Sequence, residues 1–501
     1  MPINSTASPT NQAPDMKLFW GCFIALITTS FGFIERVLTA GEWSAEFGLS
    51  ETQTGEILGA GLWPFAISII LFSLIIDRVG YKVAMYFGLA CHLVSTVLII
   101  TANSYWGMYL GTFILSLASG MVEAYINPVV ATMFNKNKTK WLNVLHAGWP
   151  GGLVIGGILA ILLGAGVGWR IKIGLILIPM AVYAFILFNK KFPVQERVLA
   201  GVSYKDMLKE VGAIGALIIS LLMFSEIGRV FGFGSTVVYV LAALVAAGFG
   251  AYTKSLGRPL FIIMLLIMMP LASTELGVDS WITSLMAGEM EKIGINAGWV
   301  LVYTSFIMMV LRFYAGPIVH KISPLGLLAV SAFLAACGLL FLSKATGMTI
   351  LLAATLYGVG KSFFWPTTLG VVAEQFPRGG ALTLNTIAAV GMLAVGIVGA
   401  PLLGNFQDQY VDRKIKTYNQ ELHAQIMEEN SGILGKYMSI DQSKLNGLDE
   451  TARSEIAAIQ QGAQKGTLST VAYLPIFMLL CYIGLIIYFR LRGGYRPEEI
   501  G

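Results

Sequence analysis

Charged residues are scarce in this chain. Asp, Glu, Lys and Arg together make up 12% of its 501 residues, whereas a soluble domain carries about 25%. Hydrophobic residues account for 56%. The composition therefore excludes an ordinary soluble globular protein and predicts an integral membrane protein.

The chain also lacks the patterns of enzymes and of nucleic-acid-binding proteins. Its four cysteines show no metal-binding or redox spacing, and we expect free thiols at Cys22, Cys91, Cys337 and Cys481. The sequence has no nucleophile–base pair, metal-ligand cluster or phosphate-binding glycine-rich loop, so we expect no enzymatic activity, no metal and no cofactor. The net charge of +5 comes from short loops and indicates no nucleic-acid partner.

Long apolar runs are what the sequence has in abundance. Most contain about 18 or more residues, enough to cross a hydrocarbon core of about 30 Å. Twelve main spans are expected near 17–40, 52–76, 82–101, 106–133, 142–165, 171–189, 259–283, 297–318, 324–343, 348–374, 380–404 and 468–490. Two more stretches, 211–228 and 235–253, predict a helical hairpin between the sixth and seventh spans, of which the first stretch is the shorter. We therefore expect an all-α polytopic membrane protein with about fourteen transmembrane helices.

The inserted hairpin divides the chain into two six-helix halves. The expected segments are a flexible N-terminus at 1–16, a six-helix bundle at 17–192, a linker with the hairpin at 193–258, a second six-helix bundle at 259–490 and a tail at 491–501. A polar stretch at 407–467 has mixed charges and good helical propensity, so we expect it to form a helical hairpin or cap on the outer face.

Lysine and arginine mark one side of the membrane. They gather in alternate loops, among them 136–140 and 190–209, and in the tail at 490–496. Short loops rich in these residues stay in the cytoplasm. We therefore expect both termini to be cytoplasmic, in a multi-pass protein of the plasma (inner) membrane that contacts lipid and is a monomer.

Two ionisable residues occur at equivalent places in the two halves. Glu123 lies four positions before the Asn127-Pro128 step, and Lys361 lies four positions before the Trp365-Pro366 step. An ion at the centre of a membrane helix costs about 2.5–3.5 kcal/mol, so it is tolerated mainly beside a partner or a wet cavity. We expect a polar cavity between the halves in which Glu123 pairs with Lys361 in one conformation.

A second correspondence supports two related halves. His146 precedes Gly152 by six residues in the fifth span, and Asn385 precedes Gly391 by six residues in the eleventh. Matching registers in six-helix halves predict parallel repeats about an axis normal to the membrane.

The loop after the second span carries a known pattern. Its sequence, Ser73-Leu-Ile-Ile-Asp77-Arg78-Val-Gly80-Tyr81-Lys82, resembles the G-x-x-x-D-R-x-G-R-K signature of the major facilitator superfamily. Asp77 can cap a neighbouring helix, Gly80 permits a tight turn, and Arg78 and Lys82 can hold the loop at the headgroups. We expect a conformational latch that stabilises the outward-facing state. The corresponding stretch of the second half begins at Arg312, for which a structural hydrogen-bonding role is expected rather than substrate binding.

Further motifs narrow the resemblance. Glu123-x-x-x-Asn127-Pro128, Phe364-Trp365-Pro366-Thr367, Leu142-Asn143-x-x-His146 and Glu275-Leu-Gly-Val-Asp-Ser-Trp281 are similar to elements of the fucose–galactose–glucose proton symporter family. The resemblance implies the major facilitator fold and carboxylates in spans one and four that bind proton and sugar. Lys361 departs from the family pattern.

The resemblance and the charge pattern together name the candidate site. The expected proton-coupling carboxylates are Glu35, Glu123 and Glu275, and the expected substrate-binding residues are Arg36, Asn127, His146, Trp281, Lys361, Trp365 and Asn385. Several have a purely structural alternative: Glu123 as an interhelical brace, His146 and the tryptophans as packing residues, and Glu35 as the ion-pair partner of Arg36.

The resemblance implies a secondary active transporter that carries a small polar solute, most simply a sugar or sugar derivative, together with protons. An organic anion bound by Arg36 and Lys361 is one alternative. A peptide transporter is another, because bacterial peptide carriers also insert two helices and Ile34-Glu35-Arg36-Val37 faintly resembles their motif. A non-transporting membrane sensor is the alternative from a different class.

Overall fold

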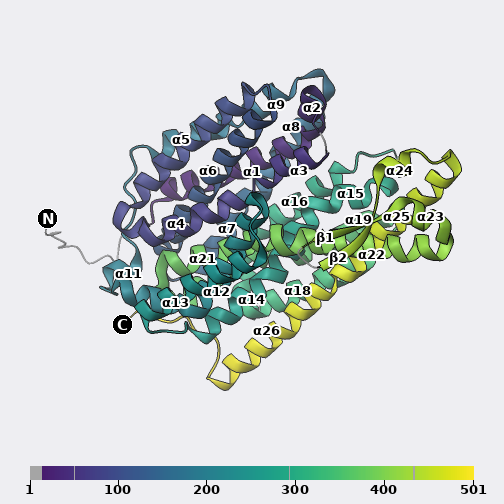
Figure 1. Cartoon of the computed structure of the whole chain (residues 1–501). Coiled ribbons are helices and arrows are strands. Elements are labelled where there is room, and N and C mark those ends of the chain that lie inside the picture. Colours follow the sequence, from purple (N-terminus) through teal and green to yellow (C-terminus); the bar gives the residue numbers. More distant parts are fainter. Residues whose placement is uncertain (1–13, 50, 293, 433–434, 501) are drawn as a thin grey trace.

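The computed structural model describes residues 14–49, 51–292, 294–432 and 435–500, and helices dominate its architecture (Figure 1). Among these residues the strands are β1 (Met427–Gly432) and β2 (Gly435–Ile440), an antiparallel pair. The expected all-α polytopic fold is confirmed.

Six crossings form the N-terminal bundle. They are α1 (Met16–Leu38), α3 with α4 (Glu51–Gly59, Trp63–Val79), α5 (Tyr81–Ile100), α6 (Tyr105–Met133), α7 with α8 (Lys138–His146, Gly148–Leu163), and α9 with α10 (Trp169–Gly174, Leu177–Leu187). Short helices α2 (Ala40–Phe47), η1 (Gly164–Gly166) and α11 (Glu196–Leu199) connect or follow them. Pro64 at the second position of α4 explains the break after α3, because proline fits the first turn of a helix but not its interior.

The C-terminal bundle has more interrupted helices. Its elements are α14 (Pro259–Ala272), the π-helical turn η2 (Ser273–Gly277), α15 (Val278–Glu291), α16 (Gly298–Phe313), α17 (Ala315–Ile322), α18 (Pro324–Leu342), α19 (Thr349–Lys361), α20 (Phe364–Gln375), η3 (Pro377–Gly379), α21 (Gly380–Ala394), the π-helical turn η4 (Val395–Gly399) and α26 (Tyr473–Leu491). Broken helices and π-turns in a membrane bundle occur where backbone groups are satisfied by protein or line a cavity.

The inserted hairpin consists of α12 (Tyr204–Phe231) and α13 (Ser235–Thr253), which pack on each other. The 28 residues of α12 form two helical pieces divided at Gly212, and the piece after Gly212 corresponds to the expected stretch 211–228. The helix bends at Gly212, whose φ of 60° and close approach to Gly257 leave no space for a side chain. Helix α12 also packs against α21, so the hairpin lies on the C-terminal bundle.

The number of crossings agrees with the sequence. Twelve helices of the described residues are long and apolar enough to span a membrane, and the pair α16 and α17, bent by 65°, makes thirteen. Helices α19 and α20 have 13 and 12 residues, each too short alone for a core of about 30 Å. Together they form the remaining expected span, broken at Ser362 and Phe363.

A lobe projects from the bundle at the end away from the termini (Figure 1). It contains α22 (Ala400–Tyr418), α23 (Gln420–Ile426), the strand pair, α24 (Gln442–Asn446) and α25 (Glu450–Val471). Its own apolar cluster includes Val411, Ile415, Ile426 and Ile456. The expected helical hairpin or cap is helical over most of its length, but residues 427–432 pair with 435–440 as strands instead of extending a helix.

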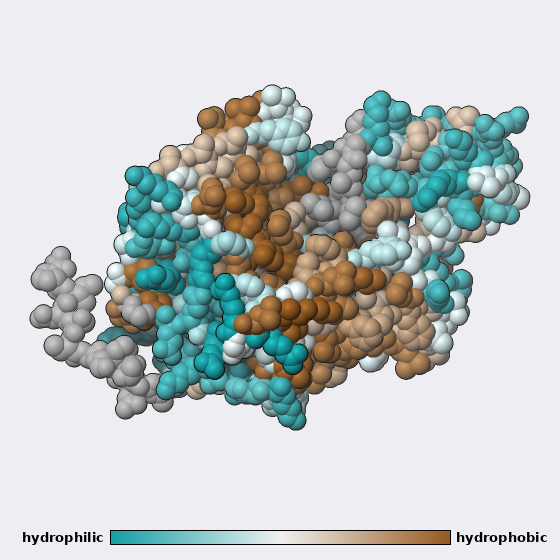
Figure 2. Space-filling model, turned by 90° about the horizontal axis from the view of Figure 1, so that it is seen from below, coloured by the Kyte–Doolittle hydropathy of each residue, from teal (hydrophilic) through white to brown (hydrophobic). Residues whose placement is uncertain are grey.

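Helix α1 begins and the described C-terminal segment ends at one end of the bundle, which we call the terminal face; the other end is the opposite face (Figure 1). Asp15 pairs with Lys190 there, and Glu498 pairs with Arg258. Figure 2 shows hydrophobic residues over the middle of the molecule and hydrophilic residues toward both ends, as expected of a protein that crosses a bilayer.

Candidate functional site

Arg312 forms the centre of a buried polar network between the two bundles. It lies in the last turn of α16, with its side chain 1% exposed. Its Nη1 donates to the carbonyl oxygen of His146 at 2.7 Å, Nη2 to Glu275 Oε1 at 2.7 Å and Nε to the carbonyl oxygen of Ser362 at 2.6 Å. Because His146 belongs to the N-terminal bundle, Arg312 connects both halves of the chain.

Local breaks in the helices position its partners. Glu275 lies in the π-helical turn η2, and Ser362 lies in the gap between α19 and α20. The second carboxylate oxygen of Glu275 accepts from the backbone N–H of Trp365 at 3.2 Å, in the first turn of α20. Free N–H groups at a helix start attract an anion, so the broken span provides Arg312 with an acceptor and Glu275 with a donor.

Lys361 is bound within the C-terminal bundle. Its ammonium donates to Asp279 and, at 3.4 Å, to Thr304 Oγ1, and it lies 5.2 Å from the centre of the Tyr357 ring. The expected ion pair between Glu123 and Lys361 is not present in the described structure. The physical reason is that Asp279, one turn beyond Glu275, provides a closer carboxylate from the same bundle.

Glu123 instead belongs to a cluster of the N-terminal bundle. Asn127 Nδ2 donates to Glu123 Oε2 at 2.5 Å, and His146 Nε2 lies 2.8 Å from Asn127 Oδ1 and 4.0 Å from Glu123 Oε2. All three side chains are buried. The structure therefore brings together three of the expected site residues, Glu123, Asn127 and His146.

A small cavity separates this cluster from the Arg312 network. Its volume is about 20 Å³, room for about one water molecule. Glu123 and His146 line it from one bundle, and Glu275, Arg312 and Trp365 line it from the other. The five residues therefore face a common space at the bundle interface.

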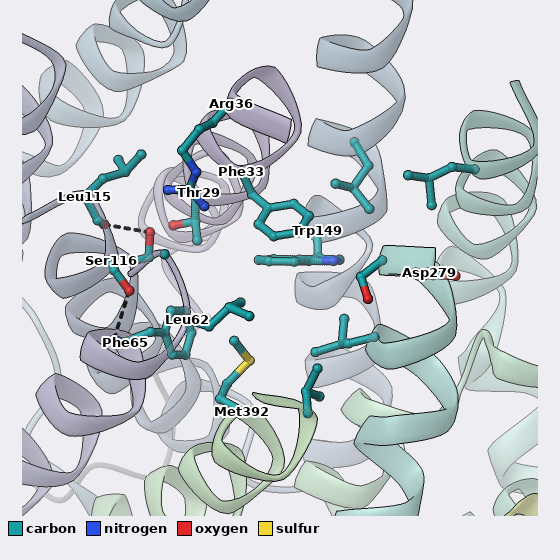
Figure 3. A pocket seen from close by; sticks show the side chains of 17 residues that line it. Thr29, Phe33, Arg36, Leu62, Phe65, Leu115, Ser116, Trp149, Asp279 and Met392 are labelled. Atoms are coloured by element: carbon teal, nitrogen blue, oxygen red, sulfur yellow. Dashed lines mark hydrogen bonds between the residues drawn. The ribbon is translucent and has the colours of Figure 1, made fainter. Parts of the chain in front are cut away.

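Two wider cavities continue from there toward the opposite face. The inner cavity has a volume of about 70 Å³ and the outer one about 780 Å³. Arg36 and Asp279 line both. Figure 3 shows Arg36 on one side of the inner cavity and Asp279 on the other, with the rings of Phe33 and Trp149 between them. The inserted hairpin contributes Glu226 and Arg229 of α12 to the outer cavity.

Glu35 and Arg36 point in different directions, and the structure does not contain the ion pair considered for them. Arg36 lies against Gly61, between α3 and α4, whereas Glu35 lies near Gly156 of α8. Neither carboxylate oxygen of Glu35 has a hydrogen-bond partner among the described residues. Residues adjacent in a helix lie about 100° apart around its axis, which explains the divergence. Glu35 is therefore buried away from Glu123, while Arg36 reaches the cavities.

Three expected substrate-binding residues remain to be placed: Asn385, Trp365 and Trp281. Asn385 Nδ2 donates to the carbonyl oxygen of Ala124 at 3.1 Å, so it joins α21 to α6 across the bundles. Trp365 lines the small cavity. The side chain of Trp281 lies outside the described part of the structure.

At the terminal face, hydrogen bonds close the interface between the bundles. Thr139 Oγ1 donates to Glu374 Oε1 at 2.5 Å, and Lys138 Nζ donates to the carbonyl oxygen of Ala373 at 3.2 Å. Deeper in the bundle, Asn143 Nδ2 donates to Thr367 Oγ1 at 3.1 Å. All three contacts run from α7 to α20.

The loop expected to act as a latch lies beside this interface. Gly80 has a φ of 88°, as the tight turn requires. Arg78 lies 5.0 Å from the centre of the Tyr204 ring, and Lys82 lies 5.8 Å from that of Tyr86. Asp77 accepts from the guanidinium of Arg197. The expected helix cap by Asp77 was wrong, because the buried Arg197 of the linker provides a charged donor.

Comparison with known proteins identifies the family. The model of the Major Facilitator Superfamily matches residues 18–400. The chain belongs to the Major Facilitator Superfamily. A search of curated proteins returned no match. The finer resemblance to the fucose–galactose–glucose symporters rests on the motifs and stays a prediction.

Solved structures of other transporters share the fold. The human organic anion transporter MFSD10 (TETRAN) superimposes with a TM-score of 0.60 at 14% identity, covering 94% of this chain and 100% of that one. A point variant of the E. coli fucose:proton symporter FucP gives 0.56 at 14% identity, covering 93% and 99%. A bacterial homologue of the human drug peptide transporters PepT1 and PepT2 gives 0.60 at 12% identity, covering 96% and 100%. At these identities the likeness shows the fold alone.

Two central residues of this superfamily member were not expected at the site. Arg312 was assigned a structural role at the end of a span, and Asp279 was not considered as a partner. The sequence could have indicated both as site residues, because they are ionisable residues inside apolar runs. The same criterion selected Glu123 and Lys361.

Proposed function

We propose that this superfamily member is a proton-coupled secondary active transporter that moves a small solute by alternating access between its two bundles. One observation carries the proposal. A chain of cavities runs from the opposite face to Glu123 and Arg312, whereas α7 and α20 are joined by hydrogen bonds at the terminal face. A solute can thus approach the centre from one side while the other is closed.

We further propose that the terminal face is cytoplasmic, in the plasma membrane, so that the structure represents the outward-facing conformation. Short loops rich in Lys and Arg support this orientation, among them the segment that carries Lys138 and the linker that carries Arg197. The latch loop, with Asp77 bound to Arg197, would then stabilise this closed side.

Glu123 is the candidate proton carrier. Its carboxyl group is buried, and its contacts within 4.0 Å are to Asn127 and His146 rather than to an arginine or lysine of the described residues. Burial of a carboxylate without a cation is costly, and binding a proton removes that cost. A proton on Glu123 would change its contacts with Asn127 and His146, whose carbonyl oxygen binds Arg312 of the other bundle. Proton binding at Glu123 would thereby affect the hydrogen bond between the His146 carbonyl oxygen and Arg312, which joins the halves.

Proteoliposomes containing a trapped pH-sensitive dye test this proposal. A panel of sugars, sugar acids, dipeptides and aromatic monocarboxylates is added outside in turn, and the lumenal pH is recorded. At least one class should acidify the lumen in vesicles with the protein and not in protein-free vesicles. Absence of proton movement and of solute uptake with every class, under imposed gradients of either sign, would contradict the proposal.

A further inference from the structure

Arg36 is a buried cation that faces the cavities without a carboxylate. Arg312 pairs with Glu275, and Arg229 of the outer cavity pairs with Glu226. The guanidinium of Arg36 forms no ion pair with any residue that the structure describes, and its buried Nε has no hydrogen-bond partner there. The residue is 2% exposed. An uncompensated buried charge is strongly unfavourable, so the site favours an anionic ligand.

The guanidinium of Arg36 occupies space that is free only because residue 61 is a glycine. It lies against Gly61, where an added Cβ would be 2.1 Å from Arg36 Nη2. A side chain at position 61 would therefore displace Arg36 from the wall of the cavity. The arrangement holds a planar, two-pronged donor at the junction of the inner and outer cavities, which suits a carboxylate.

The rest of the junction is apolar. Phe33, Leu62, Leu301 and Met392 line both cavities, and Trp149 lines the inner one. Phe33 and Trp149 lie with ring centroids 6.0 Å apart. Such walls bind a hydrophobic or aromatic body, with a few polar groups fixing its orientation.

The hydroxyl groups of the inner cavity are already engaged with the backbone. Thr29, Ser119 and Ser280 donate to carbonyl oxygens of their own segments, and Ser116 accepts from the N–H of Phe65. Thr29, Ser119 and Ser280 have each used their single hydrogen and can offer a ligand only lone pairs, so few hydroxyl donors remain for the ring oxygens and hydroxyls of a sugar. The lining therefore favours a ligand with one charged group.

A zwitterion is also disfavoured. Asp279 is the carboxylate across the cavity from Arg36 (Figure 3), but its charge is compensated by Lys361. A ligand ammonium group would have to compete with Lys361 for it. The uncompensated charge of the junction is thus positive.

From these observations we propose that the solute is an amphipathic organic anion whose carboxylate binds Arg36 and whose apolar body packs against Phe33 and Trp149. This inference rests on the proposed function, because it names the solute that is transported, but binding of the anion can be measured without transport.

Isothermal titration calorimetry of the purified full chain in detergent compares 3-phenylpropionate with its neutral amide, 3-phenylpropanamide. The acid should bind and the amide should bind at least about tenfold more weakly, as expected for loss of hydrogen bonds to a charged group. The Arg36→Gln variant should lose binding of the acid by a similar factor. Equal affinities for acid and amide, or unchanged affinity in Arg36→Gln, would overturn the inference.

Two further variants separate binding from folding. Arg36→Lys keeps the charge but loses the two-pronged geometry, and Gly61→Ala displaces the guanidinium without removing it; both should weaken binding of the acid. Arg413→Gln, on the exposed surface of the lobe, is the matched control and should bind normally. Variants are compared only where their thermal unfolding shows a folded protein.

Failure of the inference can be told apart from failure of the proposed function. Binding or transport of a sugar or dipeptide, but not of the acid, would overturn the anion while leaving the transporter intact. Binding of the acid in detergent without movement of any solute in proteoliposomes would support the Arg36 site and contradict transport.

Discussion

Arg312 and His146 belong to different bundles and are joined by a hydrogen bond of 2.7 Å from the Arg312 guanidinium to the His146 carbonyl oxygen. The same guanidinium binds Glu275, and the His146 side chain binds Asn127. This contact thus links the Glu123 cluster to the ion pairs of the C-terminal bundle. In an alternating-access transporter, such a contact must break or be replaced when the halves move.

Replacing Arg312 by Gln should cause loss of transport and of stability. Removal of one partner from a buried ion pair leaves the other charged and unpaired, at a cost of about 3–5 kcal/mol. In this variant Glu275 would be left buried and charged without its ion-pair partner. Thermal unfolding in detergent and uptake into proteoliposomes measure the two effects. A variant with normal stability and uptake would show that this contact is dispensable, and Arg413→Gln provides the control.

Lys361 should be energetically coupled to Asp279 and not to Glu123. The Lys361→Met variant leaves Asp279 unpaired, so adding Asp279→Asn should recover stability by about 0.5–3 kcal/mol, the range of directly interacting pairs. Adding Glu123→Gln to Lys361→Met should give additive effects. A double-mutant cycle on the free energy of unfolding distinguishes coupling of Lys361 to Asp279 from coupling to Glu123. Recovery of stability when Glu123→Gln, but not Asp279→Asn, is added to Lys361→Met would favour the ion pair expected from sequence.

Loss of Glu374 should loosen the terminal face. Its carboxylate accepts from Thr139 of the N-terminal bundle and from Tyr495 of the tail, at 2.5 and 2.8 Å. The Glu374→Ala variant should widen the distance distribution between spin labels placed at Lys136 and Arg378, which lie in loops of the two bundles at this face. Glu421→Ala, on the lobe, is the control. An unchanged distribution would show that other contacts suffice to keep the face closed.

The lobe should tolerate loss of one ion pair to the bundle, because α25 also packs on α15 and α18. Lys465 pairs with Glu289 of α15 at 2.9 Å; the Lys465 side chain is partly exposed, whereas Glu289 is buried and also pairs with Lys292. Partly exposed ion pairs contribute about 0–1 kcal/mol, and the lobe has an apolar cluster of its own. Lys465→Ala should therefore change the unfolding temperature little and leave uptake intact. Loss of uptake would reveal a role of the lobe in transport.

Much of the architecture could be predicted because the bilayer imposes it. Apolar runs must form helices that cross the membrane, and ions inside them are rare enough to mark the centre. Spacing of four residues along α6 also placed Glu123 beside Asn127.

Partner choice could not be predicted in the same way. Lys361 binds Asp279 because of the π-turn at Glu275 and the helix break at Ser362. Pro366 marks that break, because a proline ring clashes with the carbonyl four residues earlier, but the π-turn has no clear sequence signal. The divergence of Glu35 and Arg36 likewise depends on which helices pack on either side of α1. The strand pair of the lobe was missed because its residues, such as Glu428 and Glu429, are common in helices.

The most direct test of the central claim is transport by the Glu123→Gln variant, which keeps the shape of the side chain and mimics its protonated form. With a solute that the wild-type protein accumulates, the variant should lose accumulation driven by a pH gradient but retain counterflow exchange of that solute. Unchanged gradient-driven accumulation would contradict proton coupling through Glu123.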